Sequence, residues 1–255
     1  MKLYYREFGK GEPMLILHGL FGSSDNWQTL AKEFALNFRV FTIDLRNHGR
    51  SFHHDEFDYH VMMKDIREFV LEKKLVNISL LGHSMGGKLS MKYALHYPHQ
   101  VKHLMVVDIA PRRYQVLHEG IIKALMSLDL KSYSKREEVD KALSDWIQNY
   151  AIRQFLLKNL KRDKLGTFIW KINLDAIARN IQNLIVEISA DQPFPGKTLF
   201  IAGKKSDYIR PVDEELILEL FPRAEIIYLP GVGHWVHAQA PQLLYDAVMN
   251  FTKQI

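Results

Sequence analysis

The sequence of 255 residues contains no cysteine, which excludes a disulfide framework, thiol catalysis and thiolate metal sites. It has no apolar run of the roughly 18 residues that a membrane span requires, and no signal-peptide pattern at its N-terminus, so the cytoplasm is the expected compartment. The net charge is only +5, and the Lys and Arg residues are spread along the chain. This distribution argues against a nucleic-acid partner and is compatible with an anionic small-molecule substrate.

Short apolar runs alternate with helical patterns along most of the chain. The runs are often β-branched and end in Gly, Asp or His, as is typical of strands buried on both faces: 15–19, 40–44, 78–82, 103–108, 198–203 and 225–231. Apolar residues recur every three or four positions in residues 27–34, 61–74, 85–97 and 213–221, which predicts amphipathic helices. The fold class is therefore α/β, with a mostly parallel sheet, helices on both faces, and KLYYREF as an added edge strand.

This alternation is interrupted once, between residues 111 and 198. The interval is too long for a loop of a compact domain. It reads as helical, including residues 152–162, whereas residues 168–173 fit either a strand or a helix. We therefore expect a core of residues 1–111 and 197–255, and a helical cap of residues 112–196 inserted after the sixth strand.

A glycine-flanked serine lies where a predicted strand meets a predicted helix, in Gly82-His83-Ser84-Met85-Gly86. So abrupt a turn holds its central residue in a strained conformation, and the glycines let the strand and the helix pass closely. The serine then faces the N–H groups at the start of the helix. The alternative is a serine that only caps the helix. We predict that Ser84 is a nucleophile and that the Met85 N–H stabilises an oxyanion.

Two further glycine-rich stretches provide what such a nucleophile needs. The stretch from His18 to Gly22 follows the first core strand, and we assign the second oxyanion donor to the Leu20 N–H, with Phe21 as the second choice. Serine is a poor nucleophile without an adjacent base. His234 lies in a glycine-rich loop just after the last predicted strand, where it can reach the same sheet edge, so we expect it to be the base.

The acid that orients the histidine has two candidates. Asp207 lies one residue beyond the usual position in the loop after residues 198–203, and that position is occupied by Ser206. Asp108 ends the strand that follows the predicted elbow helix, and parallel strands end on the same edge of a sheet. We favour Asp108, with Ser206 as a supporting hydrogen-bond donor, and keep Asp207 as the alternative.

With these residues in place, the chain resembles the α/β-hydrolase superfamily along essentially its whole length. More narrowly, it is similar to the small YbfF-like esterases, which are related to abhydrolase-domain protein 11. The matching stretches are HGLFGSSDNW, DLRNHGRS, GHSMGGK, VVDIAP, FLLKNL and GVGHWVHAQAP. The resemblance also carries a triad acid at the VVDIAP position, which supports Asp108.

The resemblance implies a carboxylesterase or thioesterase that acts on small acyl esters or thioesters, acyl-CoA among them. It implies no cofactor and no metal. We expect the apolar residues of the cap to form an acyl crevice against Leu20, Phe21 and Trp235. The sequence specifies neither the acyl chain length, nor the leaving group, nor an oligomeric state.

Two other functions are compatible with the same residues. One is a non-hydrolytic lyase of the menaquinone-synthesis type, in which the serine and histidine serve as a base. That reaction requires arginines such as Arg46, Arg112 and Arg113 to converge on an anionic substrate. The other is a non-catalytic binding module with the same fold.

Overall fold

Seven strands form the central sheet of the computed structural model, which describes residues 2–115 and 119–253. Their spatial order is β1-β3-β2-β4-β5-β8-β9, and only β1 is antiparallel to its neighbour. The strands are β1 (Tyr5–Phe8), β2 (Glu12–Leu17), β3 (Phe38–Ile43), β4 (Ile78–His83), β5 (Val101–Val107), β8 (Lys197–Gly203) and β9 (Ala224–Leu229). The predicted mostly parallel sheet is confirmed.

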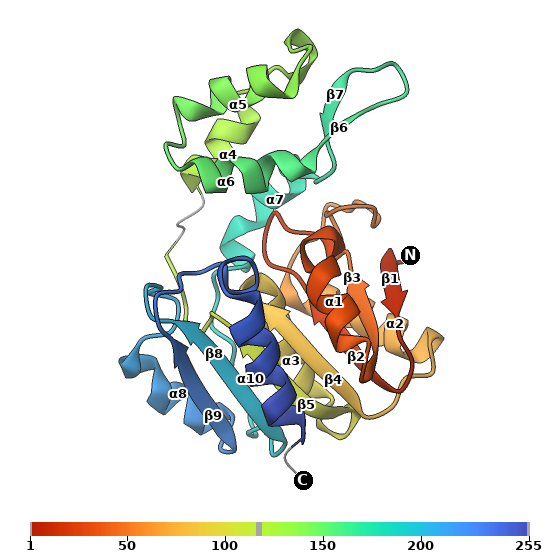
Figure 1. Cartoon of the computed structure of the whole chain (residues 1–255), viewed down its shortest axis with the longest axis vertical. Helices are drawn as coiled ribbons and strands as arrows, with labels where there is room; N and C mark the ends of the chain where they lie inside the picture. Colours follow the sequence, from red (N-terminus) through yellow and green to blue (C-terminus); the bar gives the residue numbers. More distant parts are fainter. Residues whose placement is uncertain (1, 116–118, 254–255) are drawn as a thin grey trace.

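Helices cover both faces of this sheet (Figure 1). One face packs against α1 (Gln28–Phe34) and α10 (Pro241–Lys253), and the other against α2 (Tyr59–Glu72), α3 (Met85–His96) and α8 (Glu214–Leu220). Side chains alternate between the faces along each strand. Leu81 and Met105 belong to the core under α1 and α10, whereas Leu80 and Leu104 belong to the other. Burial of both faces explains why the strands read as continuous apolar runs.

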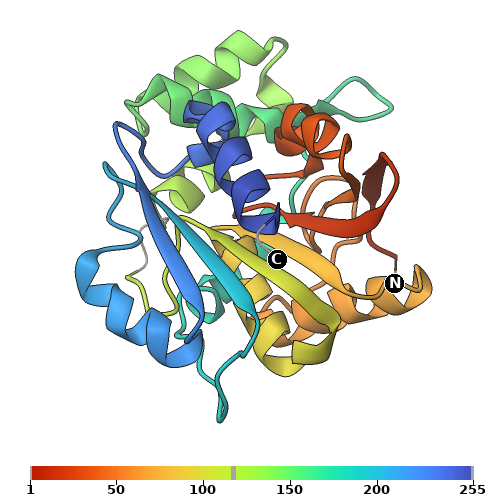
Figure 2. The same ribbon diagram turned by 60° about the horizontal axis from the view of Figure 1, so that its bottom comes forward.

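The segment between β5 and β8, called the inserted segment below, lies beyond the carboxyl ends of the strands (Figures 1 and 2). It contains α4 (Glu119–Met126), α5 (Arg136–Ser144), α6 (Tyr150–Leu156), α7 (Leu174–Asn180) and a hairpin of β6 (Leu160–Arg162) and β7 (Phe168–Trp170). It follows the fifth strand among the described residues and not the sixth, because only β1 to β5 precede it, the edge strand β1 included. The helix expected over residues 152–162 ends at Leu156, since residues 160–162 pair with β7 instead.

Short elements complete the described chain. The four-residue helix α9 (Val236–Gln239) follows the loop of His234. The 3-10 helices are η1 (Ser24–Trp27), η2 (Pro98–Gln100), η3 (Leu130–Ser132), η4 (Leu157–Asn159), η5 (Ile181–Asn183) and η6 (Pro211–Asp213). Across residues 2–115 and 119–253, we find no helix with both the length and the apolar character needed to span a bilayer.

Lys88 of α3 ties the two ends of the inserted segment to the core. Its ammonium donates hydrogen bonds to the carbonyl oxygen of Arg112 at 2.7 Å and to that of Val186. The same two ends pair through their backbones, from Tyr114 N–H to Ile185 O at 2.8 Å. Burial lowers the pKa of Lys88 to about 7.

Candidate active site

Ser84 sits at a strained turn between β4 and α3. Its φ of 52° and ψ of −119° lie outside the helical and extended regions. A Cβ at Gly82 would lie 2.2 Å from the Gly86 carbonyl oxygen, and one at Gly86 would lie 2.3 Å from that of Leu17. Glycine is therefore required at both positions. The Ser84 N–H donates to Val107 O at 3.0 Å, which continues the ladder between β4 and β5 by one residue and fixes the turn.

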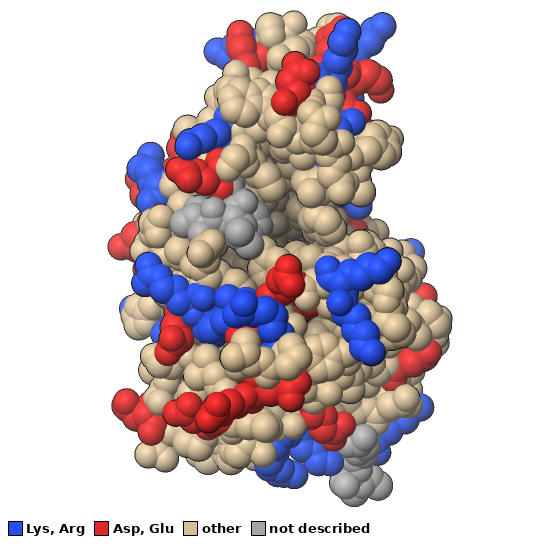
Figure 3. Space-filling model, turned by 90° about the vertical axis from the view of Figure 1, so that its left-hand side faces the viewer, with Lys and Arg blue, Asp and Glu red and all other residues tan. Residues whose placement is uncertain are grey.

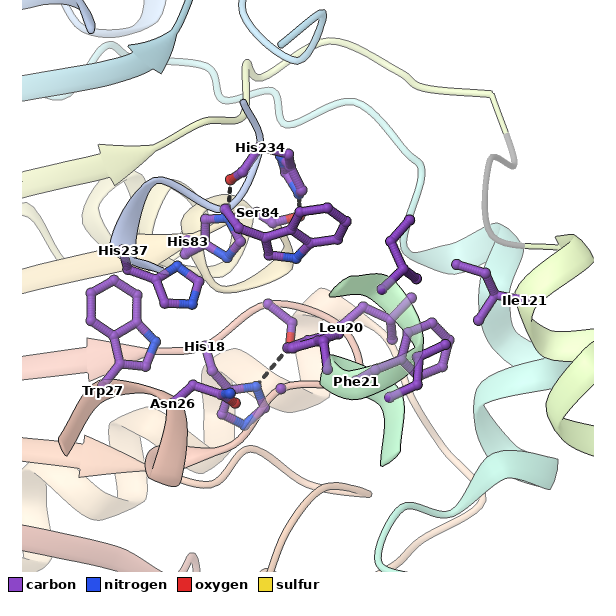
Figure 4. A pocket seen from close by; sticks show the side chains of 16 residues that line it. His18, Leu20, Phe21, Asn26, Trp27, His83, Ser84, Ile121, His234 and His237 are labelled. Atoms are coloured by element: carbon purple, nitrogen blue, oxygen red, sulfur yellow. Dashed lines mark hydrogen bonds between the residues drawn. The ribbon is translucent and has the colours of Figure 1, made fainter. Parts of the chain in front are cut away.

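His234 lies between Ser84 and an acidic side chain. Its Nε2 is 3.2 Å from Ser84 Oγ, a contact drawn as a dashed line in Figure 4. Its Nδ1 is 2.7 Å from Asp108 Oδ2. The three residues come from the ends of β4 and β5 and from the loop after β9. A neutral imidazole with the proton on Nδ1 would donate to the carboxylate and accept from the serine hydroxyl. This arrangement can transfer the serine proton to the histidine.

Asp108 is fully buried and its carboxylate is saturated with donors. Oδ1 accepts the Gly203 N–H at 2.9 Å, and Oδ2 accepts the Ser206 hydroxyl as well as the His234 ring N–H. The Asp108 N–H donates to Ile201 O at 2.8 Å. Asp207 instead has an exposed side chain, and its carbonyl oxygen accepts from Arg112. The structure thus brings Asp108, and not the Asp207 carboxylate, into contact with His234, and brings Ser206 into contact with Asp108.

The oxyanion donors expected from the sequence are the N–H of Met85 and that of either Leu20 or Phe21. The Met85 N–H opens α3, where backbone donors have no partner within the helix. In the loop after β2, the Phe21 N–H donates to His48 Nε2 at 3.2 Å and is therefore engaged. Between the two candidates in this loop, the geometry favours Leu20. Burial lowers the pKa of His48 to about 3, so the ring stays neutral and keeps its acceptor nitrogen.

Three buried histidines hold the loops around Ser84. His18 Nε2 accepts the Leu45 N–H at 3.0 Å, and its Nδ1 bonds the Gly19 carbonyl oxygen at 2.8 Å. His83 Nε2 donates to the carbonyl oxygen of His234 at 2.8 Å (Figure 4). His237 stacks on Trp27 with ring centroids 4.7 Å apart. Burial lowers the pKa of His18, His83 and His237, so these rings stay neutral near pH 7.

Two contacts of His234 were not anticipated from the sequence. Tyr208 stacks on its ring with centroids 3.8 Å apart and planes 20° apart. His83 anchors the backbone of His234 through the hydrogen bond to its carbonyl oxygen. In the sequence, only the place of His83 inside the G-x-S-x-G motif connects it with the site. No sequence signal identifies Tyr208, because it stands 26 residues before His234 in another loop.

Apolar side chains surround Ser84 on two sides. On the first side (Figure 4), Phe21 and Trp235, both named from the sequence, meet residues of α4 and α6: Ile121, Ile152, Phe155 and Leu156. On the second side, Leu20 and Met85 lie with Tyr59, Ile109, Tyr114, Ile181, Leu184, Ile185 and Tyr208. The inserted segment contributes to both sides, and such a lining suits an acyl chain.

Of the three arginines that a lyase would need, Arg46 lines none of the cavities around Ser84 and His234, whereas Arg112 and Arg113 line a groove beside His234. The Arg46 guanidinium is buried and forms a two-pronged ion pair with Asp65, at 2.5 and 2.7 Å. Arg112 is paired with Asp213 at 2.8 Å and lies over the Tyr114 ring, 3.9 Å from its centroid. Arg46 therefore has a structural environment, and Arg112 is largely neutralised.

Comparison with known proteins identifies the family of this chain. Residues 12–152 match the family described as alpha/beta hydrolase fold. The sn-1-specific diacylglycerol lipase ABHD11 of Xenopus laevis is 38% identical over 95% of this chain and 80% of its own length. The chain belongs to the α/β-hydrolase family. Esterase YbfF of Escherichia coli (strain K12) is 28% identical, with 94% of this chain and 92% of that protein covered.

A solved structure shares almost the whole architecture. The protein described as a marine microorganism esterase has a TM-score of 0.96 and 43% sequence identity, over 98% of this chain and 99% of its own. Other solved α/β-hydrolases are more distant. A thioesterase domain from the curacin biosynthetic pathway has a TM-score of 0.71 at 20% identity, which shows a shared fold alone.

Proposed function

We propose that this chain is a serine hydrolase that cleaves carboxylic esters and thioesters through an acyl-enzyme on Ser84. The observation that carries the proposal is the chain of contacts from Ser84 Oγ to His234 Nε2, at 3.2 Å, and from His234 Nδ1 to Asp108, at 2.7 Å. Membership of the α/β-hydrolase family and the esterase and lipase names of the relatives support ester cleavage.

The mechanism follows from these positions. Ser84 Oγ attacks the acyl carbonyl carbon while His234 takes its proton, and Asp108 stabilises the imidazolium that results. The N–H groups of Met85 and Leu20 bind the tetrahedral oxyanion, each worth about 3–4 kcal/mol in comparable enzymes. The bond to the leaving oxygen or sulfur then breaks, and His234 donates its proton to that atom. A water molecule, deprotonated by His234, next attacks the acyl-enzyme and releases the acid.

We also propose that residues 112–196 act as a cap over the acyl group. The inserted segment contributes Ile121, Phe155 and Leu156 to one apolar side of Ser84 and Ile181 and Ile185 to the other. An acyl chain attached to Ser84 Oγ would bury apolar surface there, at about 0.8 kcal/mol per buried methylene group.

The direct test is Ser84→Ala, assayed with p-nitrophenyl butanoate and with a butanoyl thioester. We expect turnover of both substrates to fall by at least about 10³-fold, because the nucleophile is removed. Ser79→Ala is the matched control: Ser79 is a buried serine of the same strand whose hydroxyl lies 3.1 Å from His103 Nδ1, away from the site. Retained activity in Ser84→Ala, or labelling of another residue by a fluorophosphonate, would contradict the proposal.

A further inference from the structure

A groove with positively charged walls opens beside His234. It has a volume of about 770 Å³ and is lined by residues 112–115, at the start of the inserted segment, and by residues 205–208 and Arg210, which follow β8. Four of its side chains are cationic, namely Arg112, Arg113, Lys205 and Arg210, and one, Asp207, is acidic. On the face drawn in Figure 3, Lys and Arg side chains gather below the hollow between the inserted segment and the core.

The four cations are not equally engaged. Arg112 is paired with Asp213 at 2.8 Å, and Arg210 is 3.6 Å from the same carboxylate. Arg113 and Lys205 are both exposed, and within the described residues neither side chain has an ion-pair partner. Two cations without an ion-pair partner therefore remain, one on each of the two segments that line the groove, and they attract an anion.

The groove is placed to receive the leaving group of the substrate and not its acyl group. Both apolar sides border Ser84 and suit the acyl group, whereas the charged groove does not border Ser84. His234 borders the groove and also the first apolar side. In the proposed reaction, His234 donates its proton to the leaving atom, so that atom lies against the His234 ring. The group attached to the leaving atom can then extend along the groove, which also borders His234.

We propose that this groove selects substrates whose leaving alcohol or thiol carries a phosphate group, bound between Arg113 and Lys205. The inference rests on the proposed function and refines its substrate class. The phosphate belongs to the leaving group and not to the acyl chain, because the cations lie on the His234 side. A phosphorylated thiol and a phosphorylated glycerol present the same charge to these two residues, so the experiment needs one pair of substrates for each.

The test compares matched neutral and phosphorylated substrates. One pair is butanoyl pantetheine and butanoyl phosphopantetheine, and the other is monobutanoylglycerol and its phosphate. We expect a higher kcat/KM for the phosphorylated member of at least one pair, with a preference that weakens as salt is added. The double variant Arg113→Glu/Lys205→Glu should lower the phosphorylated-to-neutral ratio by about tenfold, since two attractive charges become repulsive. Lys32→Glu, an exposed charge reversal on α1, is the matched control and should leave the ratio unchanged.

A binding measurement separates this inference from the proposed function. Titration calorimetry with the products phosphopantetheine and pantetheine, and with glycerol phosphate and glycerol, requires no turnover. Tighter binding of a phosphorylated product that is lost in the double variant would support the groove, whether or not Ser84 proves to be the nucleophile. Preference for one pair only would support it and identify the carrier. Equal binding of both members of both pairs, or a preference that survives the double variant, would overturn it.

Discussion

The carboxyl edge of the sheet and the inserted segment face the same cavity but hold their side chains by different means. At the sheet edge, Ser84 and Asp108 both have a φ of 52°, and each extends a parallel ladder through its own N–H. The inserted segment contributes Ile152 and Phe155 from α6, a helix of seven residues. The candidate chemistry therefore depends on backbone geometry, whereas the apolar lining consists of side chains that can be exchanged without disturbing the sheet.

Among the following variants, replacement of Asp108 should have the largest effect, because the candidate chemistry depends on the sheet edge. Asp108→Asn should lower kcat by about 10³–10⁴-fold, because an amide in place of the carboxylate no longer holds the required tautomer of His234 or stabilises its charged form. Asp207→Asn is the matched control, and its kcat should stay within about twofold, since its side chain is exposed and apart from His234. Rates with p-nitrophenyl butanoate decide between them. Collapse of Asp207→Asn alone would assign the acid to Asp207.

Much of this edge could be predicted from the sequence, since it depends on local patterns. Apolar runs located the strand ends, and the glycines around Ser84 marked the turn. The choice between Asp108 and Asp207 stayed open, because it depends on distances between loops far apart in the chain. The helix expected over residues 152–162 was wrong in its last part for the same reason: residues 160–162 have helical spacing, and pairing with residues 168–170, which fit either a strand or a helix, overrides it.

A second contrast is sensitivity to acid. His48 and His237 lie in the core, and burial lowers the pKa of each from 6.5 to about 3. The unfolded chain binds protons at these residues below about pH 6.5, and the folded protein does not. Their contribution to stability is therefore complete above that pH and is lost as the pH falls toward 3. At about pH 5, protonation of each of these histidines in the unfolded chain should lower the free energy of unfolding by about 2 kcal/mol relative to about pH 8.

His48→Gln tests this contribution by urea unfolding at about pH 8 and about pH 5. A glutamine can accept the Phe21 N–H but does not titrate, so the difference between the two pH values should shrink by about 2 kcal/mol. His60→Gln, at an exposed position of α2, should leave the difference unchanged. An undiminished pH dependence in His48→Gln would mean that His48 is not held neutral by the fold.

The inserted segment should affect selectivity more than rate. The Phe155 ring lies 6.2 Å from that of Trp235 and lines the first apolar side of Ser84. Phe155→Ala should lower the octanoate-to-acetate ratio of kcat/KM by about five- to tenfold, because long chains lose more buried surface than short ones. Leu165→Ala, at a position that is 90% exposed in the same segment, should not change the ratio. An equal loss with both esters would mean that Phe155 contributes to the chemistry or to folding.

The smallest expected effect lies at the sheet edge, where Ser206 supports the acid. Its hydroxyl donates to the Asp108 oxygen that also contacts His234. Without this donor the carboxylate attracts the imidazolium more strongly, so Ser206→Ala should move the acidic limb of the kcat/KM profile to higher pH by about half a unit and lower kcat by about fivefold. Ser206→Thr keeps a hydroxyl and should restore both. A lower kcat with an unmoved pH profile would show that Ser206 acts only through loop stability, and the electrostatic coupling to Asp108 would then be absent.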